Sequence, residues 1–317
     1  MSAPASLRAL IGALGDCRRE AREAAARVLT EQGEGRLAAA VGDALRGDSS
    51  AVVALGDLRA LRPLARALAC SEGDLRAAAA RALSLLGAPA GPVLARVLRR
   101  GCLEARVAAA QALSAFDDPG AIAALVRALT HREPRLRAAA AQALGRAGSP
   151  TAVEPLIAAL DDGDASVRAA AQGALVAIGP GAVSRLLRLL REGRPELQEA
   201  VAAVLAGIGA PCVPAVAALL AHPDPRARRA AIEVLTAIGA DAAAALPELR
   251  WQAGHDPSPQ LRQLGRAALR QVRAAGRQAP RELQAAMPPQ GTGTELEAAS
   301  PADGRGTELL SAPPQVE

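Results

Sequence analysis

Three histidines are the best candidates in this sequence for a general base or a metal ligand, and four cysteines could act as nucleophiles or metal ligands. The cysteines lie far apart without metal-site spacing, which predicts reduced thiols in a cytoplasmic protein at Cys17, Cys70, Cys102 and Cys212. The sequence contains no glycine-rich phosphate loop, no nucleophile elbow and no neighbouring Cys–His pair. We therefore expect a protein that is not an enzyme and that binds no cofactor and no metal.

A segment of about 30 residues recurs along most of the chain, and its clearest copy is residues 164–179. When its arginine is numbered position 0, apolar residues recur at positions 3, 7 and 10, which trace one face of an α-helix. Small residues around position 3 allow neighbouring helices to approach closely. A glycine often stands at position 11, where we expect the left-handed conformation that closes a helix. The position-0 residues are Arg76, Arg106, Arg137, Arg168, Gln198, Arg228 and Arg262.

A shorter apolar segment, often with a proline near its start, precedes each copy and predicts a first helix. One such helix pair cannot bury its own apolar face, so the copies must stack into a solenoid. We expect a solenoid over residues 1–275, with an N-terminal cap at 5–30, a degenerate repeat at 34–56 and regular repeats at 57–275. Residues 276–317, rich in Pro, Gly and Gln, are predicted to be disordered.

Three features resemble the HEAT-repeat superfamily, in the short form also called phycobilisome-lyase-like HEAT repeats. They are the Gly-[Asp/Ser/Ala]-Pro step, the Leu-x-x-x-Leu helix and the Asp-x-x-x-Arg start of the second helix, over roughly residues 57–273. The resemblance implies an all-α solenoid of about eight to nine stacked antiparallel helix pairs. The superfamily includes scaffolds, lyase subunits and DNA-repair proteins, so the resemblance does not imply a function. Deoxyhypusine hydroxylase has similar repeats with His-Glu metal ligands, but this chain has no His-Glu dipeptide.

The arginines at position 0 stand in the first turn of a helix, where the helix dipole disfavours a positive charge. Acids four residues earlier could compensate that charge, at Glu72, Glu133, Asp164 and Asp224. We interpret Arg76, Arg106, Arg137, Arg168, Arg228 and Arg262 as a structural ion-pair ladder rather than as a row of ligand-binding arginines.

The histidines stand six or seven residues before a position-0 arginine, which places all three in equivalent turns, at His131, His222 and His255. Repeats stack at roughly 8–10 Å, too far apart for an easy shared metal with bonds of about 2 Å. Trp251, the one tryptophan, is expected to pack under the C-terminal cap.

The second helices of such solenoids line the concave face. Their side chains outside the core stripe are the candidate partner-binding residues: Arg81, Gln111, Gln142, Gln172, Glu199, Arg229, Glu233 and Arg266. The strip is mixed in charge and contains little aromatic surface. It predicts either a solvated helix face or a groove that binds a partner.

The formal charge is +5, with 37 basic residues that are all arginine, a composition typical of a GC-rich genome. We expect no dense basic block and no basic stripe, which disfavours nucleic acid as a partner. No run approaches the ~20 apolar residues of a membrane span.

The leading hypothesis is a monomeric, non-catalytic scaffold or adaptor in the cytoplasm that binds another protein along the solenoid surface. Two alternatives remain open: a nucleic-acid-binding HEAT-like protein, and a lyase-type enzyme subunit similar to the phycobilin lyases.

Overall fold

The computed structural model describes residues 7–192 and 195–285, with side chains for 7–191 and 197–277. Helices are the regular elements of this part of the chain, and it contains no strand. The α-helices are α1 (Leu7–Ala13), α2 (Arg19–Glu31), α3 (Gly35–Arg46), α4 (Ser50–Leu55), α5 (Leu61–Ala67), α6 (Gly73–Leu85), α7 (Gly91–Arg100), α8 (Leu103–Leu113), α9 (Pro119–Ala128), α10 (Pro134–Ala147), α11 (Val153–Ala159), α12 (Ala165–Ile178), α13 (Pro180–Glu192), α14 (Pro195–Ile208), α15 (Val213–Ala218), α16 (Pro225–Ile238), α17 (Leu246–His255) and α18 (Pro259–Ala285). Short 3₁₀ helices are η1 (Leu58–Ala60), η2 (Ala88–Ala90), η3 (Pro150–Ala152), η4 (Ala210–Cys212), η5 (Leu219–Ala221) and η6 (Gly239–Ala245).

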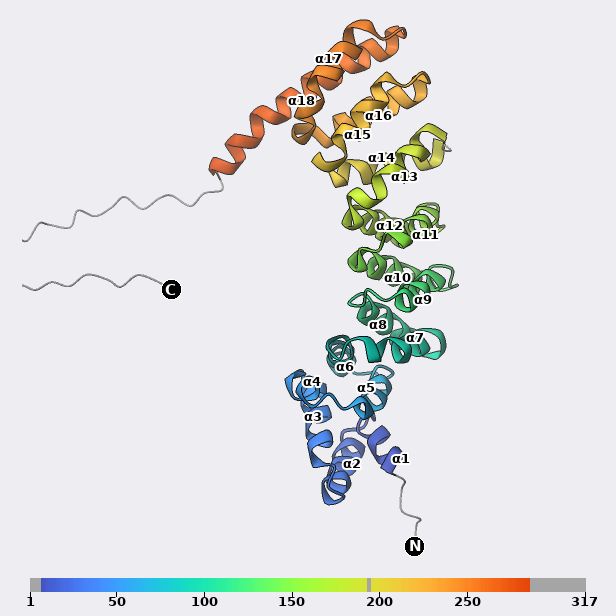
Figure 1. The fold of residues 1–317 in the computed structure, drawn as a ribbon, viewed down its shortest axis with the longest axis vertical. Coiled ribbons are helices and arrows are strands. Elements are labelled where there is room, and N and C mark those ends of the chain that lie inside the picture. The colour runs from blue at the N-terminus through green and yellow to red at the C-terminus, as the bar shows by residue number, and fades with distance from the viewer. Residues whose placement is uncertain (1–6, 193–194, 286–317) are drawn as a thin grey trace, which may run out of the picture.

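From α5 onward, each odd-numbered helix pairs with the even-numbered helix that follows it, and the pairs stack in one direction (Figure 1). Each second helix packs against the second helix of the next pair, from α6 through to α18. In Figure 1, α6, α8, α10 and α12 lie on the left of the stack, and α7, α9 and α11 lie on the right. The predicted all-α solenoid is confirmed.

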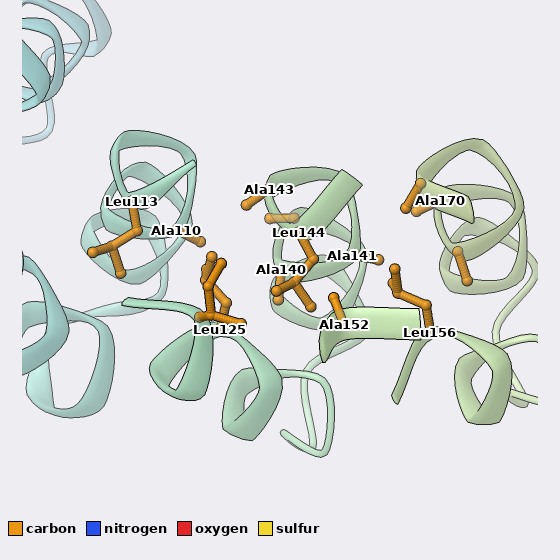
Figure 2. Close-up of a cluster of buried hydrophobic side chains, with 14 of the residues drawn as sticks. Ala110, Leu113, Leu125, Ala140, Ala141, Ala143, Leu144, Ala152, Leu156 and Ala170 are labelled. Carbon is orange, nitrogen blue, oxygen red and sulfur yellow. The ribbon is translucent and has the colours of Figure 1, made fainter. Parts of the chain in front are cut away.

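Alanine and leucine form a continuous core between the two helix layers (Figure 2). Leu113 and Leu144 from second helices and Leu125 and Leu156 from first helices are fully buried. Full burial of one such side chain contributes about 1.5–3 kcal/mol. The small residues allow close helix contact: a Cβ added at Gly145 of α10 would lie 2.6 Å from a backbone atom of α12.

Glycines end several second helices, but their conformation differs from the expected one. Only Gly148 of that column is left-handed, with φ 66° and ψ 10°. Gly87, Gly179, Gly209 and Gly239 also have positive φ, of 65° to 74°. Their ψ values, between −125° and −154°, are extended instead. This region is open essentially to glycine alone. It turns the chain directly into the next element.

The N-terminal helices do not continue the regular alternation. Helix α1 packs against α5, and α3 packs against α6. The loop between α1 and α2 therefore lies against α5, and a Cβ at Gly15 would meet the carbonyl oxygen of Pro63 at 1.8 Å. A hollow of about 380 Å³ opens at this break, lined by Leu14, Arg19, Arg22, Glu23, Ala26, Ala38, Gly42, Leu45, Arg46 and Leu75.

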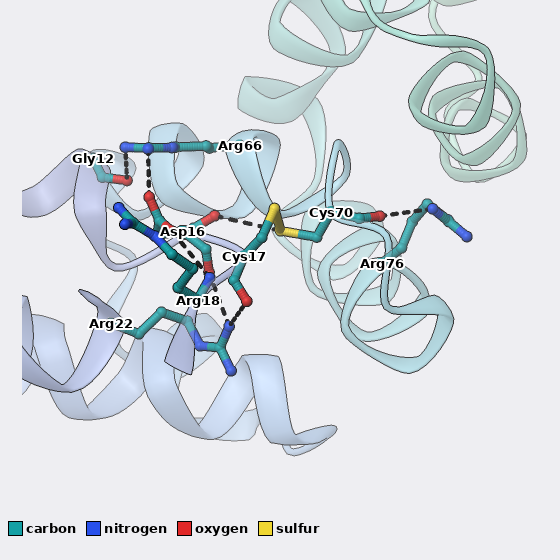
Figure 3. Close-up of a disulfide and its surroundings, with 9 residues drawn as sticks. Gly12, Asp16, Cys17, Arg18, Arg22, Arg66, Cys70 and Arg76 are labelled. Carbon is teal, nitrogen blue, oxygen red and sulfur yellow. Dashed lines mark hydrogen bonds and ion pairs between the residues drawn. A yellow bond between two sulfur atoms is a disulfide. The ribbon is translucent and has the colours of Figure 1, made fainter. Parts of the chain in front are cut away.

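A disulfide joins Cys17 and Cys70 across this contact (Figure 3). Beside it, Arg66 forms an ion pair with Asp16 at 2.6 Å. The prediction that all four cysteines are reduced is wrong for this pair. Because disulfides persist in oxidising compartments, the cysteines no longer support a cytoplasmic location. Cys102 is a free, exposed thiol, whereas Cys212 is free and buried.

One stretch of the described residues, Pro225–His255, is long and apolar enough to cross a membrane by length and composition alone. In the fold it divides into α16, η6 and α17, and all three pack against α18. Helix α18 continues past residue 275 to Ala285. The rest of the predicted tail, 286–317, lies outside the described residues.

Candidate functional site: the second-helix face

The eight candidate partner-binding residues all lie on second helices, from α6 to α18. Seven are exposed, and Gln172 is half-buried. The two ends of the stack lie to the left of its middle in Figure 1, so the second helices occupy the inner side of the bend. The candidate residues therefore form a polar row that crosses successive repeats on this side.

Contacts within this row are local. Arg229 and Glu233 form an ion pair of 2.8 Å along α16. Arg266 Nε donates a hydrogen bond to the carbonyl oxygen of Ala253 at 3.3 Å. Among the described side chains, no hydrogen bond or ion pair joins two candidates from different repeats. Most of the row is thus free to contact a partner.

The position-0 arginines lie on the turn between the paired helices, and each is half-buried. Their guanidinium groups donate to backbone carbonyl oxygens five or six residues earlier, at 2.6 to 2.9 Å. The accepting carbonyls belong to residues at or just beyond the end of the first helix, such as Gly101 after α7 and Asp162 after α11. The arginines therefore bind the backbone of the turn and hold it against the second helix.

Two of these arginines also pair with a carboxylate of the following repeat. Arg137 donates two hydrogen bonds to Asp162, both of 2.7 Å. Arg228 binds Asp256 at 2.8 and 3.2 Å. Each acid stands six residues before the next position 0. The ion pairs thus lock one repeat to its neighbour through bidentate geometry.

The prediction that each arginine pairs with the acid four residues earlier is therefore wrong. Asp164 and Asp224 act as helix caps instead, accepting from the backbone N–H of Ser166 at 2.8 Å and of Arg226 at 2.8 Å. The sequence did carry a signal for the actual partners, because Asp or His recurs six residues before position 0 in several repeats.

Both pairs lower the pKa of their carboxyl groups. The hydrogen bonds from Arg137 hold the pKa of Asp162 below its usual value, against an opposing effect of burial. Burial is the largest influence at Asp256 and raises its pKa, but hydrogen bonds from Arg228 and from the Ser258 N–H outweigh it, and the pKa is lowered overall.

Two of the three histidines occupy the predicted turns. His131 and His222 each accept a backbone N–H at Nδ1, at 3.1 Å in both cases. The prediction is wrong for His255, which ends α17 and stacks on Trp251 with the ring centres 5.3 Å apart. Trp251 itself is 58% exposed and does not pack under a cap. Among the described residues, no group of three His, Cys, Asp or Glu side chains is arranged to hold a metal ion.

Arg266 belongs to a larger set of arginines that was not among the predicted site residues. Over residues 259–277, five arginines share one face of α18, which corrects the expectation that the chain has no basic stripe. Their spacing of four, four, three and four residues was the signal for this set: Arg262, Arg266, Arg270, Arg273 and Arg277. We call this set the arginine stripe.

The stacked antiparallel helix pairs, joined by arginine-bound turns, define an α-solenoid. The chain belongs to the HEAT-repeat family, because the family model for HEAT repeats matches residues 91–176, 123–196 and 183–270, more than half of its length. No curated protein matches the sequence.

Several solved structures have a similar fold. The archaeal HEAT-like repeats protein from Thermococcus onnurineus NA1 is 14% identical, with 87% of this chain and 100% of that chain covered and a TM-score of 0.32. The complex of CpcE and CpcF of phycocyanin lyase from Nostoc sp. PCC7120 is 22% identical, with 78% and 94% covered and a TM-score of 0.35. Human deoxyhypusine hydroxylase is 23% identical, with 84% and 96% covered and a TM-score of 0.31. These likenesses concern the repeat fold.

Proposed function

We propose that this protein is a monomeric, non-catalytic scaffold that binds another protein along its second-helix face. The observation that carries the proposal is the exposed polar row on successive second helices, which an extended partner can contact over many repeats at once. The polar side chains of the turns, by contrast, form hydrogen bonds with the backbone and between repeats. They therefore stabilise the solenoid and are not available to a partner.

The test reverses one ion pair of this row without removing it. Arg229→Glu combined with Glu233→Arg inverts two exposed charges while retaining an i,i+4 pair on α16. The matched control is Arg19→Glu with Glu23→Arg, because this pair on α2 has the same spacing and is also exposed. The free energy of unfolding of both variants should lie within about 0.5 kcal/mol of the parent's.

Capture of proteins from lysate at physiological salt, with nuclease present, then distinguishes the surfaces. We expect the parent and the α2 control to retain one discrete protein that the α16 variant loses. Retention of that protein by all three would place its binding surface away from α16. Light scattering of the purified chain measures its molar mass in solution and so tests whether it is a monomer.

Nucleic-acid binding is the second candidate, and the arginine stripe is the observation in its favour. It predicts that the captured material disappears with nuclease and that binding to a duplex weakens steeply with salt. Nuclease-resistant capture of a protein would argue against it.

A further inference from the structure

The arginine stripe is a continuous positive surface. At 100° per residue, its five arginines fall within about 80° of one face of α18 and extend over about 22 Å. The buried residues of the same helix, Leu261, Ala268 and Val272, lie on a different side and pack onto the solenoid. The far end of α18 projects from the stack on its inner side (Figure 1).

Over residues 259–277 of the helix no carboxylate balances this charge, because this stretch contains five arginines and no Asp or Glu. Arg262 and Arg266 donate hydrogen bonds to the backbone carbonyls of Asp256 and Ala253, and neither forms an ion pair within hydrogen-bond distance among the described residues. The other three arginines of the stripe are exposed. A hollow of about 500 Å³ runs along the base of the stripe, lined by Pro259, Arg262, Gln263, Arg266 and Arg270.

We propose that the arginine stripe is a docking surface for an acidic, carboxylate-rich segment of a partner protein. The planar guanidinium group binds a carboxylate through two parallel hydrogen bonds. Arginines one helical turn apart, at about 5–6 Å, come close to the roughly 6.6 Å between alternate side chains of an extended peptide. One acidic strand can therefore meet successive arginines of the stripe.

The surroundings favour a peptide over nucleic acid. Single-stranded nucleic acids bind through stacking on aromatic side chains as well as through charge, but residues 259–277 include no aromatic. The exposed Trp251 points away from α18, because its helix buries Leu249 and Ala253 on the opposite side. Beyond the stripe, the neighbouring second helices carry Glu199 and the Arg229–Glu233 ion pair, so the positive surface does not continue across the face as a long phosphate backbone would require.

The proposal rests on the proposed scaffold function and names the chemistry of the partner segment that the arginine stripe would bind. Its test uses the full chain, a fluorescein-labelled peptide of six Glu-Ser repeats, and an oligothymidylate of twelve nucleotides as a competing probe. The stripe variant is Arg270→Glu, Arg273→Glu and Arg277→Glu. These exposed arginines make no contact that holds the fold. The matched control, Arg96→Glu, Arg99→Glu and Arg100→Glu, changes the net charge equally with exposed residues of α7.

We expect the peptide to bind the parent with a salt-dependent Kd, measured by fluorescence anisotropy. The stripe variant should bind at least about ten-fold more weakly, since three charge-assisted pairs are lost. The α7 control should stay within about two-fold of the parent. Circular dichroism of all three chains verifies that the helices are retained.

Three outcomes of the peptide-binding measurements would overturn the proposal. One is equal weakening in the stripe variant and the control. Another is tighter binding of oligothymidylate than of the peptide. The third is a more than ten-fold gain in peptide affinity when four of the chain's own five acids beyond α18 are neutralised by Glu295→Gln, Glu297→Gln, Asp303→Asn and Glu308→Gln, because the chain itself would then be the occupant. Capture of a protein partner that the stripe variant retains would leave the scaffold function intact and overturn only this assignment.

Discussion

Replacing His131 with aspartate is expected to stabilise the protein, because both nitrogens of this imidazole face hydrogen-bond donors. Nδ1 lies 3.1 Å from the backbone nitrogen of Glu133, and Nε2 lies 2.7 Å from Nη1 of Arg106. A neutral imidazole has only one acceptor nitrogen, so one of the two donors stays unsatisfied. A carboxylate accepts both, as Asp162 does at the same position of the next repeat.

The magnitude follows from that equivalent pair. The side chains of Arg137 and Asp162 are 15% and 13% exposed, so solvent screens their charges only in part. A hydrogen bond between charged groups contributes about 1.5–3 kcal/mol, and a fully exposed ion pair about 0.2–1 kcal/mol. After the loss of imidazole packing, we expect His131→Asp to gain about 1 kcal/mol. For a chain of this size the unfolding midpoint then rises by roughly 1–2 °C.

Thermal unfolding followed by circular dichroism at neutral pH, at low and at high salt, measures this gain. The matched control is His222→Asp. His222 occupies the same turn position, but the preceding repeat has Gln198 in place of the arginine. The control should therefore gain less stability, and the difference between its unfolding midpoint and the parent's should not depend on salt. A lower midpoint for His131→Asp, or an equal gain in both variants, would refute the assignment of the turn pair.

Three further predictions concern the same architecture. Asp256→Ala should destabilise the protein by about 3–5 kcal/mol, measured by urea unfolding, because Asp256 is 0% exposed and the change leaves Arg228 without its carboxylate. Asp162 has a pKa below its usual value, so its stabilising contribution is complete above the unfolded-state pKa of about 3.9 and is lost as the pH falls through the lower folded-state pKa. Asp162→Asn should remove that part of the loss of stability in acid. An unchanged dependence of stability on acidic pH in this variant would contradict the prediction. Gly145→Ala should cost about 1–3 kcal/mol through its 2.6 Å backbone approach, whereas the same change at Gly173, where nothing lies within 4 Å, should gain about 0.5–1 kcal/mol; equal effects on the two midpoints would show that the close helix contact is unimportant.

The helix pairs were predictable because their determinants are local. Apolar positions three, seven and ten residues after an arginine lie on one face whatever the surroundings, and a pair with such a face must stack. The candidate row on the second helices followed from the same periodicity. Its residues Arg81, Gln111 and Gln142 are exposed on α6, α8 and α10, and their role in binding stays a prediction.

Contacts across repeats were harder to predict. The acid nearest in the chain is the expected partner of each arginine, but stacking places the turn of the next repeat closer. Arg137 therefore meets Asp162 rather than Glu133. The same limit hid the exposure of Trp251, because the burial of a helix face depends on which neighbour covers it.

The disulfide shows the division between sequence and structure most clearly. A regular solenoid brings together only neighbouring repeats, so Cys17 and Cys70, 53 residues apart, were expected to lie far from each other. The displaced α3–α4 segment allows α1 to contact α5 directly, and this contact joins the two cysteines. Periodicity by itself thus determined the helices, their pairing and the solenoid. Only the tertiary structure decided which repeats touch, which charges pair and which cysteines meet, because these depend on how one irregular repeat shifts the stack.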